Sequence, residues 1–203
     1  MRVRLKNWQR QVQYPPATLQ FKGPAVFGSL AIAWSLAWCC GAEMVEPVLE
    51  PGHEEQWCFA RGSWRMNDDI LDQQDATRGS VAILRDPAFS DCTLDFEFNV
   101  KPVGSGVRAA AACFRATGTR TYYWLHLDTK HNNVILVRSS PSNSWNEIQR
   151  TPHALEDDTW NRATIVCRGS EISVSINGTQ VLKAADTVLA AGCVGLGTSQ
   201  GQV

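Results

Sequence analysis

The chain has 203 residues, of which 19 are Lys or Arg and 20 are Asp or Glu, so its formal net charge is −1 at neutral pH. It lacks the excess of positive charge that proteins use to bind nucleic-acid phosphates, and we therefore expect no nucleic-acid partner. The part of the chain beyond residue 42 is long enough for one domain with a core of its own.

Residues 1–42 have the composition of an export signal. They hold five basic residues and no acidic one, and Pro24–Ala42 carries no charge. The apolar part, Ala25–Trp38, is shorter than the roughly 20 residues of a membrane-spanning helix, and Cys40–Ala42 offers small residues for cleavage. We expect a cleaved signal peptide or a retained N-terminal anchor, and a secreted, periplasmic or cell-surface protein. Membrane contact is expected only through an uncleaved segment.

Residues 43–56 are acidic, contain proline and show no periodic pattern, which is typical of a linker. The expected domain therefore covers residues 57–203. Without residues 1–42, the chain has 14 basic and 20 acidic residues.

Short strand patterns with turns between them fill this domain. The clearest is a hairpin in which Ala163, Ile165 and Cys167 alternate with polar or exposed positions, as a half-buried strand requires. Ile172, Val174 and Ile176 alternate in the same way, and Asn177-Gly178 forms the next turn. Other strands are predicted at residues 63–66, 70–73, 80–84, 92–100, 107–115, 121–128, 134–140, 147–150, 180–183 and 194–198.

A dozen short strands without an amphipathic helix predict an all-β fold. Their regular spacing favours a two-sheet antiparallel jelly-roll sandwich over a parallel fold. The sequence ends at Val203, where a further strand is expected, which is the pattern of a jelly roll that lacks its last strand.

The five cysteines beyond residue 42 are Cys58, Cys92, Cys113, Cys167 and Cys193. Their wide spacing contains no C-x-x-C pair, which argues against a zinc knuckle or a redox motif. Cys92 and Cys167 are in phase with apolar neighbours and are expected to be buried. One or two disulfides are possible, and an odd number leaves at least one free thiol.

The domain resembles the concanavalin A-like lectin/glucanase superfamily, and more closely laminin-G-like modules and 3-keto-disaccharide hydrolases. The matching segments are R-G-S-W-R-M-N-D-D-I-L (61–71), F-S-D-C-T-L-D-F-E-F (89–98), G-S-G-V (104–107), F-R (114–115), Y-Y-W-L-H-L-D (122–128), D-T-W-N (158–161), I-N-G (176–178) and G-C-V-G-L-G-T (192–198). The resemblance implies two curved antiparallel sheets, with a ligand held on the concave sheet or on loops at its rim.

The segment 122–128 carries the candidate ligand-binding residues. Tyr123, Leu125 and Leu127 form one face and are expected in the core, while Trp124, His126 and Asp128 form the other. An exposed Trp, His and Asp in a row can stack a sugar ring and bind its hydroxyl groups. Arg115 and Arg138 are candidates to join this ligand-binding set. The alternative is structural: Trp124 covers the sheet, and Asp128 opens a turn by binding its own backbone.

Three functions follow, and one of them is a structural or adhesion module on the cell surface. The favoured one is an exported, non-catalytic jelly-roll module that binds carbohydrate or another extracellular partner. The alternative is an enzyme that cleaves glycosidic bonds like the 3-keto-disaccharide hydrolases, with His126 or Asp128 as catalytic base. Its relatives carry an acidic residue in the segment 123–128, where this chain has Trp124 and His126, which weakens that alternative.

Paired carboxylates of the glucanase type are absent from the sequence. Asp95 and Glu97 share a strand face but lie opposite apolar residues, so they are predicted on a polar outer surface. No cofactor is predicted, and the dispersed histidines favour no metal site. Calcium at the sheet rim is implied by the resemblance alone, with Asp128 or Asp157 and Asp158 as donors.

Overall fold

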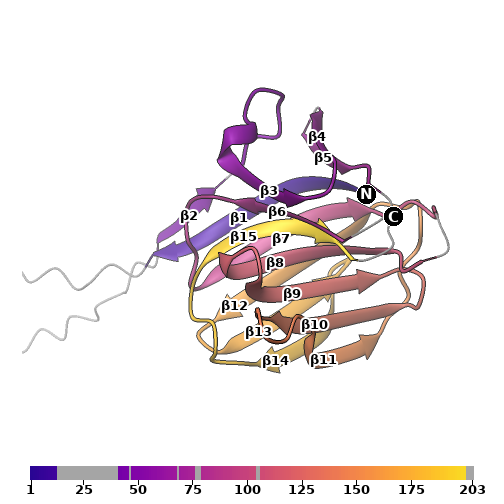
Figure 1. The fold of residues 1–203 in the computed structure, drawn as a ribbon. Helices are drawn as coiled ribbons and strands as arrows, with labels where there is room; N and C mark the ends of the chain where they lie inside the picture. The colour runs from indigo at the N-terminus through magenta and orange to yellow at the C-terminus, as the bar shows by residue number, and fades with distance from the viewer. Residues whose placement is uncertain (13–40, 46, 68, 76–78, 104–105, 200–203) are drawn as a thin grey trace, which may run out of the picture.

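The computed structural model describes residues 1–12, 41–45, 47–67, 69–75, 79–103 and 106–199. In this part of the chain, two antiparallel β-sheets pack face to face, and the one helical element is the short 3-10 helix η1 (Glu54–Gln56). Figure 1 shows the two layers, with the strands of each running roughly side by side. The predicted all-β, two-sheet jelly-roll sandwich is therefore confirmed.

The first sheet, sheet A, has eight strands. Its order is β14-β13-β12-β7-β1-β5-β4, and β2 pairs with β1 beside this path. The strands are β1 (Arg2–Val12), β2 (Gly41–Val45), β4 (Trp64–Asn67), β5 (Ile70–Gln73), β7 (Cys92–Asn99), β12 (Asn161–Arg168), β13 (Glu171–Ile176) and β14 (Thr179–Ala185).

The second sheet, sheet B, has seven strands in the order β11-β10-β9-β8-β15-β6-β3. They are β3 (Trp57–Arg61), β6 (Ser80–Leu84), β8 (Ala109–Gly118), β9 (Thr121–Asp128), β10 (Asn133–Ser139), β11 (Asn146–Pro152) and β15 (Cys193–Thr198). The alanine run at residues 109–112 lies in β8, as its flanking glycines predict.

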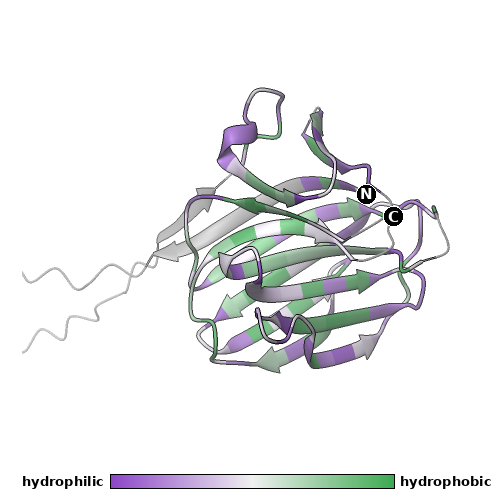
Figure 2. Cartoon of the chain, in the orientation of Figure 1, coloured by the Kyte–Doolittle hydropathy of each residue, from purple (hydrophilic) through white to green (hydrophobic). Residues whose placement is uncertain are grey.

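The main core lies between the sheets, where alternate residues of each strand meet. Ile165 on β12 and Val174 on β13 are fully buried there, together with Leu125 and Leu127 of β9. A second apolar cluster, which includes Trp124, Ile135 and Val137, covers the other face of sheet B. Figure 2 shows apolar residues running along the central strands of both sheets. The inner strands of sheet B are thus buried on both faces, whereas its edge strands β3 and β11 are partly exposed. In sheet A, β12 and β13 keep the alternation of a half-exposed strand.

The N-terminus differs from the sequence-based expectation. Residues 2–12 form β1, which pairs with β7 on one side and β5 on the other, inside sheet A. Val3 is fully buried while Arg2 is exposed, so the basic residues alternate with apolar ones as in any half-buried strand. The basic residues at the N-terminus therefore fit an export signal and a half-buried strand equally well. The apolar part of the expected signal, Ala25–Trp38, lies outside the described residues.

The expected linker at residues 43–56 is also partly structured. β2 pairs with β1, and Leu49 is buried in the main core. The fold therefore begins before Trp57. Among the described residues, no helix is long and apolar enough to span a membrane.

The last described strand, β15, is internal rather than at an edge, since it pairs with both β6 and β8. Val203, where a further strand is expected, lies outside the described residues. The five cysteines from Cys58 onward are all free thiols in the structure.

Candidate functional site

A groove lies on the outer face of sheet B, the face turned away from the main core, with a cavity volume of about 420 Å³. Its floor comes from β9 and β10, and its rims from β3, β11 and the segments next to β8, β10 and β15. The lining residues are Arg61, Val107, Tyr122, Trp124, His126, Asp128, Ile135, Ser139, Ser144, Trp145, Arg150 and Ser199.

Strand β9 supplies the floor through Trp124, His126 and Asp128, which share one face as the alternation predicts. Their exposed fractions are 6%, 4% and 5%, so the expectation that they are exposed is wrong. The physical reason is that the groove walls, which come from distant segments of the chain, cover them.

Small residues on the neighbouring strands make room for these side chains. His126 faces Ala111 of β8, which in turn faces Gly197 of β15. A Cβ atom at Gly197 would overlap both the indole of Trp124 and the carbonyl oxygen of Ser80. Glycine at this position therefore lets Trp124 lie against β15.

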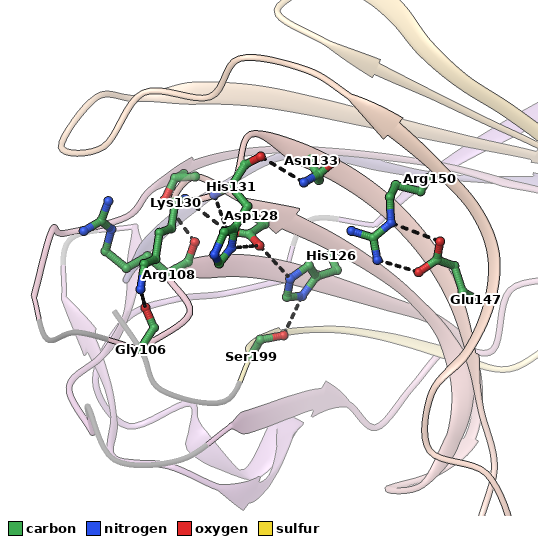
Figure 3. A network of polar contacts seen from close by, with 11 residues as sticks. Gly106, Arg108, His126, Asp128, Lys130, His131, Asn133, Glu147, Arg150 and Ser199 are labelled. Atoms are coloured by element: carbon green, nitrogen blue, oxygen red, sulfur yellow. Dashed lines mark hydrogen bonds and ion pairs between the residues drawn. The ribbon is translucent and has the colours of Figure 1, made fainter.

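His126 has polar contacts on both ring nitrogens (Figure 3). Its Nδ1 atom is 2.5 Å from the Oγ atom of Ser199, which follows β15. Its Nε2 atom is 3.9 Å from an oxygen of Asp128. This distance is too long for a hydrogen bond but allows electrostatic attraction. If Nε2 carries the proton toward Asp128, Nδ1 accepts the hydroxyl hydrogen of Ser199.

Asp128 is held by the turn that follows β9. One carboxylate oxygen accepts hydrogen bonds of 3.0 Å from the backbone N–H groups of Lys130 and His131, and the other is 2.8 Å from Nδ1 of His131. Burial raises the pKa of Asp128, but the interactions with His126 and His131 outweigh it and lower the pKa far below its usual value. The predicted structural role of Asp128 in its turn is thus confirmed, and its lowered pKa favours the ionised carboxylate in the groove.

Sequence reasoning missed the residues that form the rim. Trp145 is 44% exposed, and its ring meets His126 edge-on with centroids 5.2 Å apart. Asn143 fixes the loop, because its side-chain oxygen accepts a hydrogen bond from the backbone N–H of Trp145. On β11, Arg150 forms two hydrogen bonds with Glu147. The one sequence signal for Trp145 is a tryptophan within a polar, serine-rich turn.

Arg115 does not line the groove, so the structure does not bring it together with the other predicted ligand-binding residues on β9. Its φ angle of 48° places it in the left-handed region and interrupts the alternation of β8, where the register with β9 shifts. The side chain is 2% exposed and donates hydrogen bonds to the backbone carbonyls of Ser90, Leu189 and Gly169. Arg115 thus connects the segments that contain Ser90, Leu189 and Gly169 by hydrogen bonds.

Arg138 does not lie in the groove either. It is opposite Tyr123 on β9 and therefore shares the face of that residue, not the face of His126. Its guanidinium pairs with Asp186, which also accepts a hydrogen bond of 2.5 Å from the hydroxyl of Tyr123. This network links sheet B to the segment after β14.

Three of the acidic residues outside the groove, Asp95, Asp157 and Asp158, have basic partners. Asp95 binds the guanidinium of Arg162 on the outer face of sheet A, as predicted for a polar surface. Asp157 pairs with Arg108 and Asp158 with Lys101. The described residues include no group of three potential metal ligands, so they give the calcium expectation no support.

A family model matches residues 50–203, about three quarters of the chain, and describes a 3-keto-alpha-glucoside-1,2-lyase-like domain. The chain belongs to this family. The groove of this lyase-like domain lies within the matched residues, whereas β1 and β2 precede them. No curated protein is similar enough in sequence to count as a relative.

Solved structures with the same fold include carbohydrate-binding proteins. Carbohydrate-binding module CBM66 from Bacillus subtilis is 18% identical, with a TM-score of 0.65 over 71% of this chain and 88% of the module. A protein from the same organism with a galectin-like fold is 15% identical, with a TM-score of 0.56 over 74% and 86%. The Ca²⁺/Man3GlcNAc-bound lumenal domain of VIP36 is 14% identical, with a TM-score of 0.56 over 72% and 79%. The TM-scores show that the lyase-like domain shares its fold with these proteins. The predicted resemblance to the 3-keto-disaccharide hydrolases is confirmed by the family match.

Proposed function

We propose that the lyase-like domain binds a carbohydrate in the groove of sheet B, with Trp145 as its stacking surface. The observation that carries this proposal is the position of Trp145, a large exposed aromatic ring on the rim directly beside the buried polar floor. A sugar presents apolar C–H groups on its ring faces and hydroxyl groups around its edge. An aromatic wall next to fixed polar groups matches both surfaces.

The floor supplies the polar half of such a site. Asp128 accepts hydrogen bonds and has a lowered pKa that favours its ionised form, while Ser199 can both donate and accept. Neighbours with the same fold include a carbohydrate-binding module and a mannose-containing complex, which supports a sugar as the ligand. Export to the periplasm or cell surface, where free glycans occur, is part of the same proposal.

Calorimetric titration of the full chain with a panel of mono- and disaccharides tests this function. The Trp145→Ala variant should bind at least about 10-fold more weakly, because an anchoring aromatic residue is lost. Trp160→Ala is the matched control, since Trp160 lies on the outer face of sheet A. Loss of binding in both variants, or in neither, contradicts the groove as the sugar site.

A lyase activity is the second candidate, favoured by the family match and by the polar contacts of His126. In a 3-keto-glucoside, the keto group makes the hydrogen on C2 acidic. His126 would take this proton as Ser199 releases its hydrogen bond, and the C1–O bond would break as the C1–C2 double bond forms. The proton on the imidazole then passes to the departing alcohol.

Asp128 is a poor choice for this base, because its lowered pKa leaves it little affinity for a proton. Incubation with a 3-keto-disaccharide, followed by detection of the released sugar, tests the activity. We expect release by the wild type, loss of at least about 100-fold in His126→Gln, and no loss in His153→Gln. Sugar binding without release would leave the domain as a binding module.

A further inference from the structure

Cys92 on β7 and Cys167 on β12 lie directly opposite each other in neighbouring antiparallel strands. Both side chains are 0% exposed and belong to the main core. The Cα atoms of opposite residues in such strands are about 4.5 or 5.5 Å apart, and disulfides span Cα distances of about 4.4 to 6.8 Å. The register alone therefore brings the two sulfur atoms within reach of a bond.

The other described cysteines are not paired in this way. Cys193 faces Ala116, Cys113 faces Gly195, and Cys58 faces Ile83. Cys92 and Cys167 are thus the one directly opposite cysteine pair among the described residues from 47 to 199.

The surroundings of the pair shift the pKa values of the two thiols in opposite directions in the folded protein. The hydrogen bond between the two thiols, together with burial, raises the pKa of Cys92, whereas the same hydrogen bond lowers that of Cys167. The buried guanidinium of Arg115 lowers the pKa of both thiols further, and Asp91, 3.8 Å from that guanidinium, opposes it. Thiol–disulfide exchange proceeds through a thiolate, which either cysteine of the pair can supply once the strands separate.

We propose that Cys92 and Cys167 form a dithiol–disulfide site that a small-molecule disulfide, such as oxidised glutathione, converts to a cross-strand bond between β7 and β12. The thiolate of one cysteine of the pair attacks one sulfur of the oxidant, which forms a mixed disulfide and releases one glutathione thiolate. The other cysteine then loses its proton and attacks the sulfur of the first, which releases the second glutathione. Two protein thiols are oxidised, and one oxidised glutathione is reduced to two thiols.

Because neither sulfur is exposed, glutathione reaches the pair when the strands separate. The bond therefore forms rapidly while the chain folds and slowly once it is native. It closes a long loop between positions 92 and 167, and long loops give a large stabilisation in the chain-entropy description.

The experiment uses the full chain, refolded with oxidised glutathione and in parallel with a reductant. After the remaining thiols are blocked with iodoacetamide, a tryptic digest without reduction is analysed by mass spectrometry. Trypsin places Cys92 in residues 86–108 and Cys167 in residues 163–168, each with a single cysteine. We expect these two peptides linked after oxidative refolding, separate after reduction, and a Tm of the oxidised protein about 5 to 15 °C higher.

Matched variants separate this pair from the other cysteines. Cys92→Ala and Cys167→Ala should each lose both the linked peptides and the rise in Tm, whereas Cys113→Ala should keep both. If a variant does not fold, peptide mapping of the wild type still decides. Both peptides blocked by iodoacetamide after oxidative refolding, or either linked to another cysteine, would overturn the proposal.

Discussion

The Nδ1 atom of His126 lies 2.5 Å from the Oγ atom of Ser199, although 73 positions separate the two residues. The contact exists because β15 pairs with β8, and β8 with β9, so the end of β15 reaches the floor residue on β9. It fixes the orientation of the imidazole in the groove. A ligand in the groove would therefore meet the imidazole in one fixed orientation.

The first prediction concerns Ser199→Ala. Without the hydroxyl, His126 loses its 2.5 Å partner and the groove loses one group that binds hydroxyls. We expect sugar affinity to fall about 5- to 10-fold, which corresponds to one hydrogen bond of about 1 kcal/mol. Titration calorimetry measures it. Ser173→Ala, on the outer face of sheet A, is the control, and an equal affinity in both variants would exclude Ser199 from the site.

The second prediction is a pH dependence at Asp128. Its pKa is lower in the folded protein than the value of about 4 in an unfolded chain, so its ionised form stabilises the fold above that value. This stability is fully present near neutral pH and is lost as pH falls from about 4 toward the folded pKa. The free energy of unfolding of Asp128→Asn should therefore be about 1 to 3 kcal/mol below that of the wild type near pH 7.

Urea unfolding at several pH values checks this prediction. The gap between wild type and Asp128→Asn should narrow as pH falls below about 4, where the carboxylate of the unfolded chain is already protonated. Asp158→Asn is the control, because Asp158 is paired with Lys101 on the surface. A gap that stays constant down to about pH 2 contradicts an ionised, hydrogen-bonded Asp128.

The sequence predicted most of the strands and the face on which each β9 residue lies. The alternation of apolar and polar side chains along β9 was enough to assign the two faces, because Tyr123 and Leu125 differ from His126 in polarity. It did not show that His126 is buried, since burial depends on Trp145 and Ser199, which come from distant segments. Alternation also failed at Arg115, where a positive φ angle turns the side chain away from the groove.

The third prediction tests the shape of the groove floor through Gly197→Ala. The new Cβ atom would overlap the backbone oxygen of Ser80 and the ring of Trp124. Both the backbone at Ser80 and the ring of Trp124 must therefore shift, and we expect a loss of about 1 to 3 kcal/mol in stability. Gly118→Ala is the control, since a Cβ atom at that position would have no neighbour within 4 Å. Denaturant unfolding and tryptophan fluorescence measure both effects, and unchanged values in Gly197→Ala contradict this packing.

The fourth prediction tests whether β1 belongs to the fold. Val3 is 0% exposed and opposite Phe98 of β7 and Leu71 of β5, both of which are also 0% exposed. An unpaired carboxylate there would be buried without a partner, so Val3→Asp should lower the stability of the full chain by about 3 kcal/mol or more. Arg2→Gln, at an exposed position of the same strand, should change it by less than about 0.5 kcal/mol.

Denaturant unfolding of these two variants also bears on the expected signal peptide. If residues 1–42 were removed during export, β5 and β7 would each lose the strand between them, and the mature domain would need another partner at that position. A chain that begins at Glu43 should then unfold at a lower denaturant concentration than the full chain. Equal unfolding midpoints for the two chains, together with an unchanged stability in Val3→Asp, would show that β1 does not stabilise the fold. The basic N-terminal pattern would then belong to a removable leader.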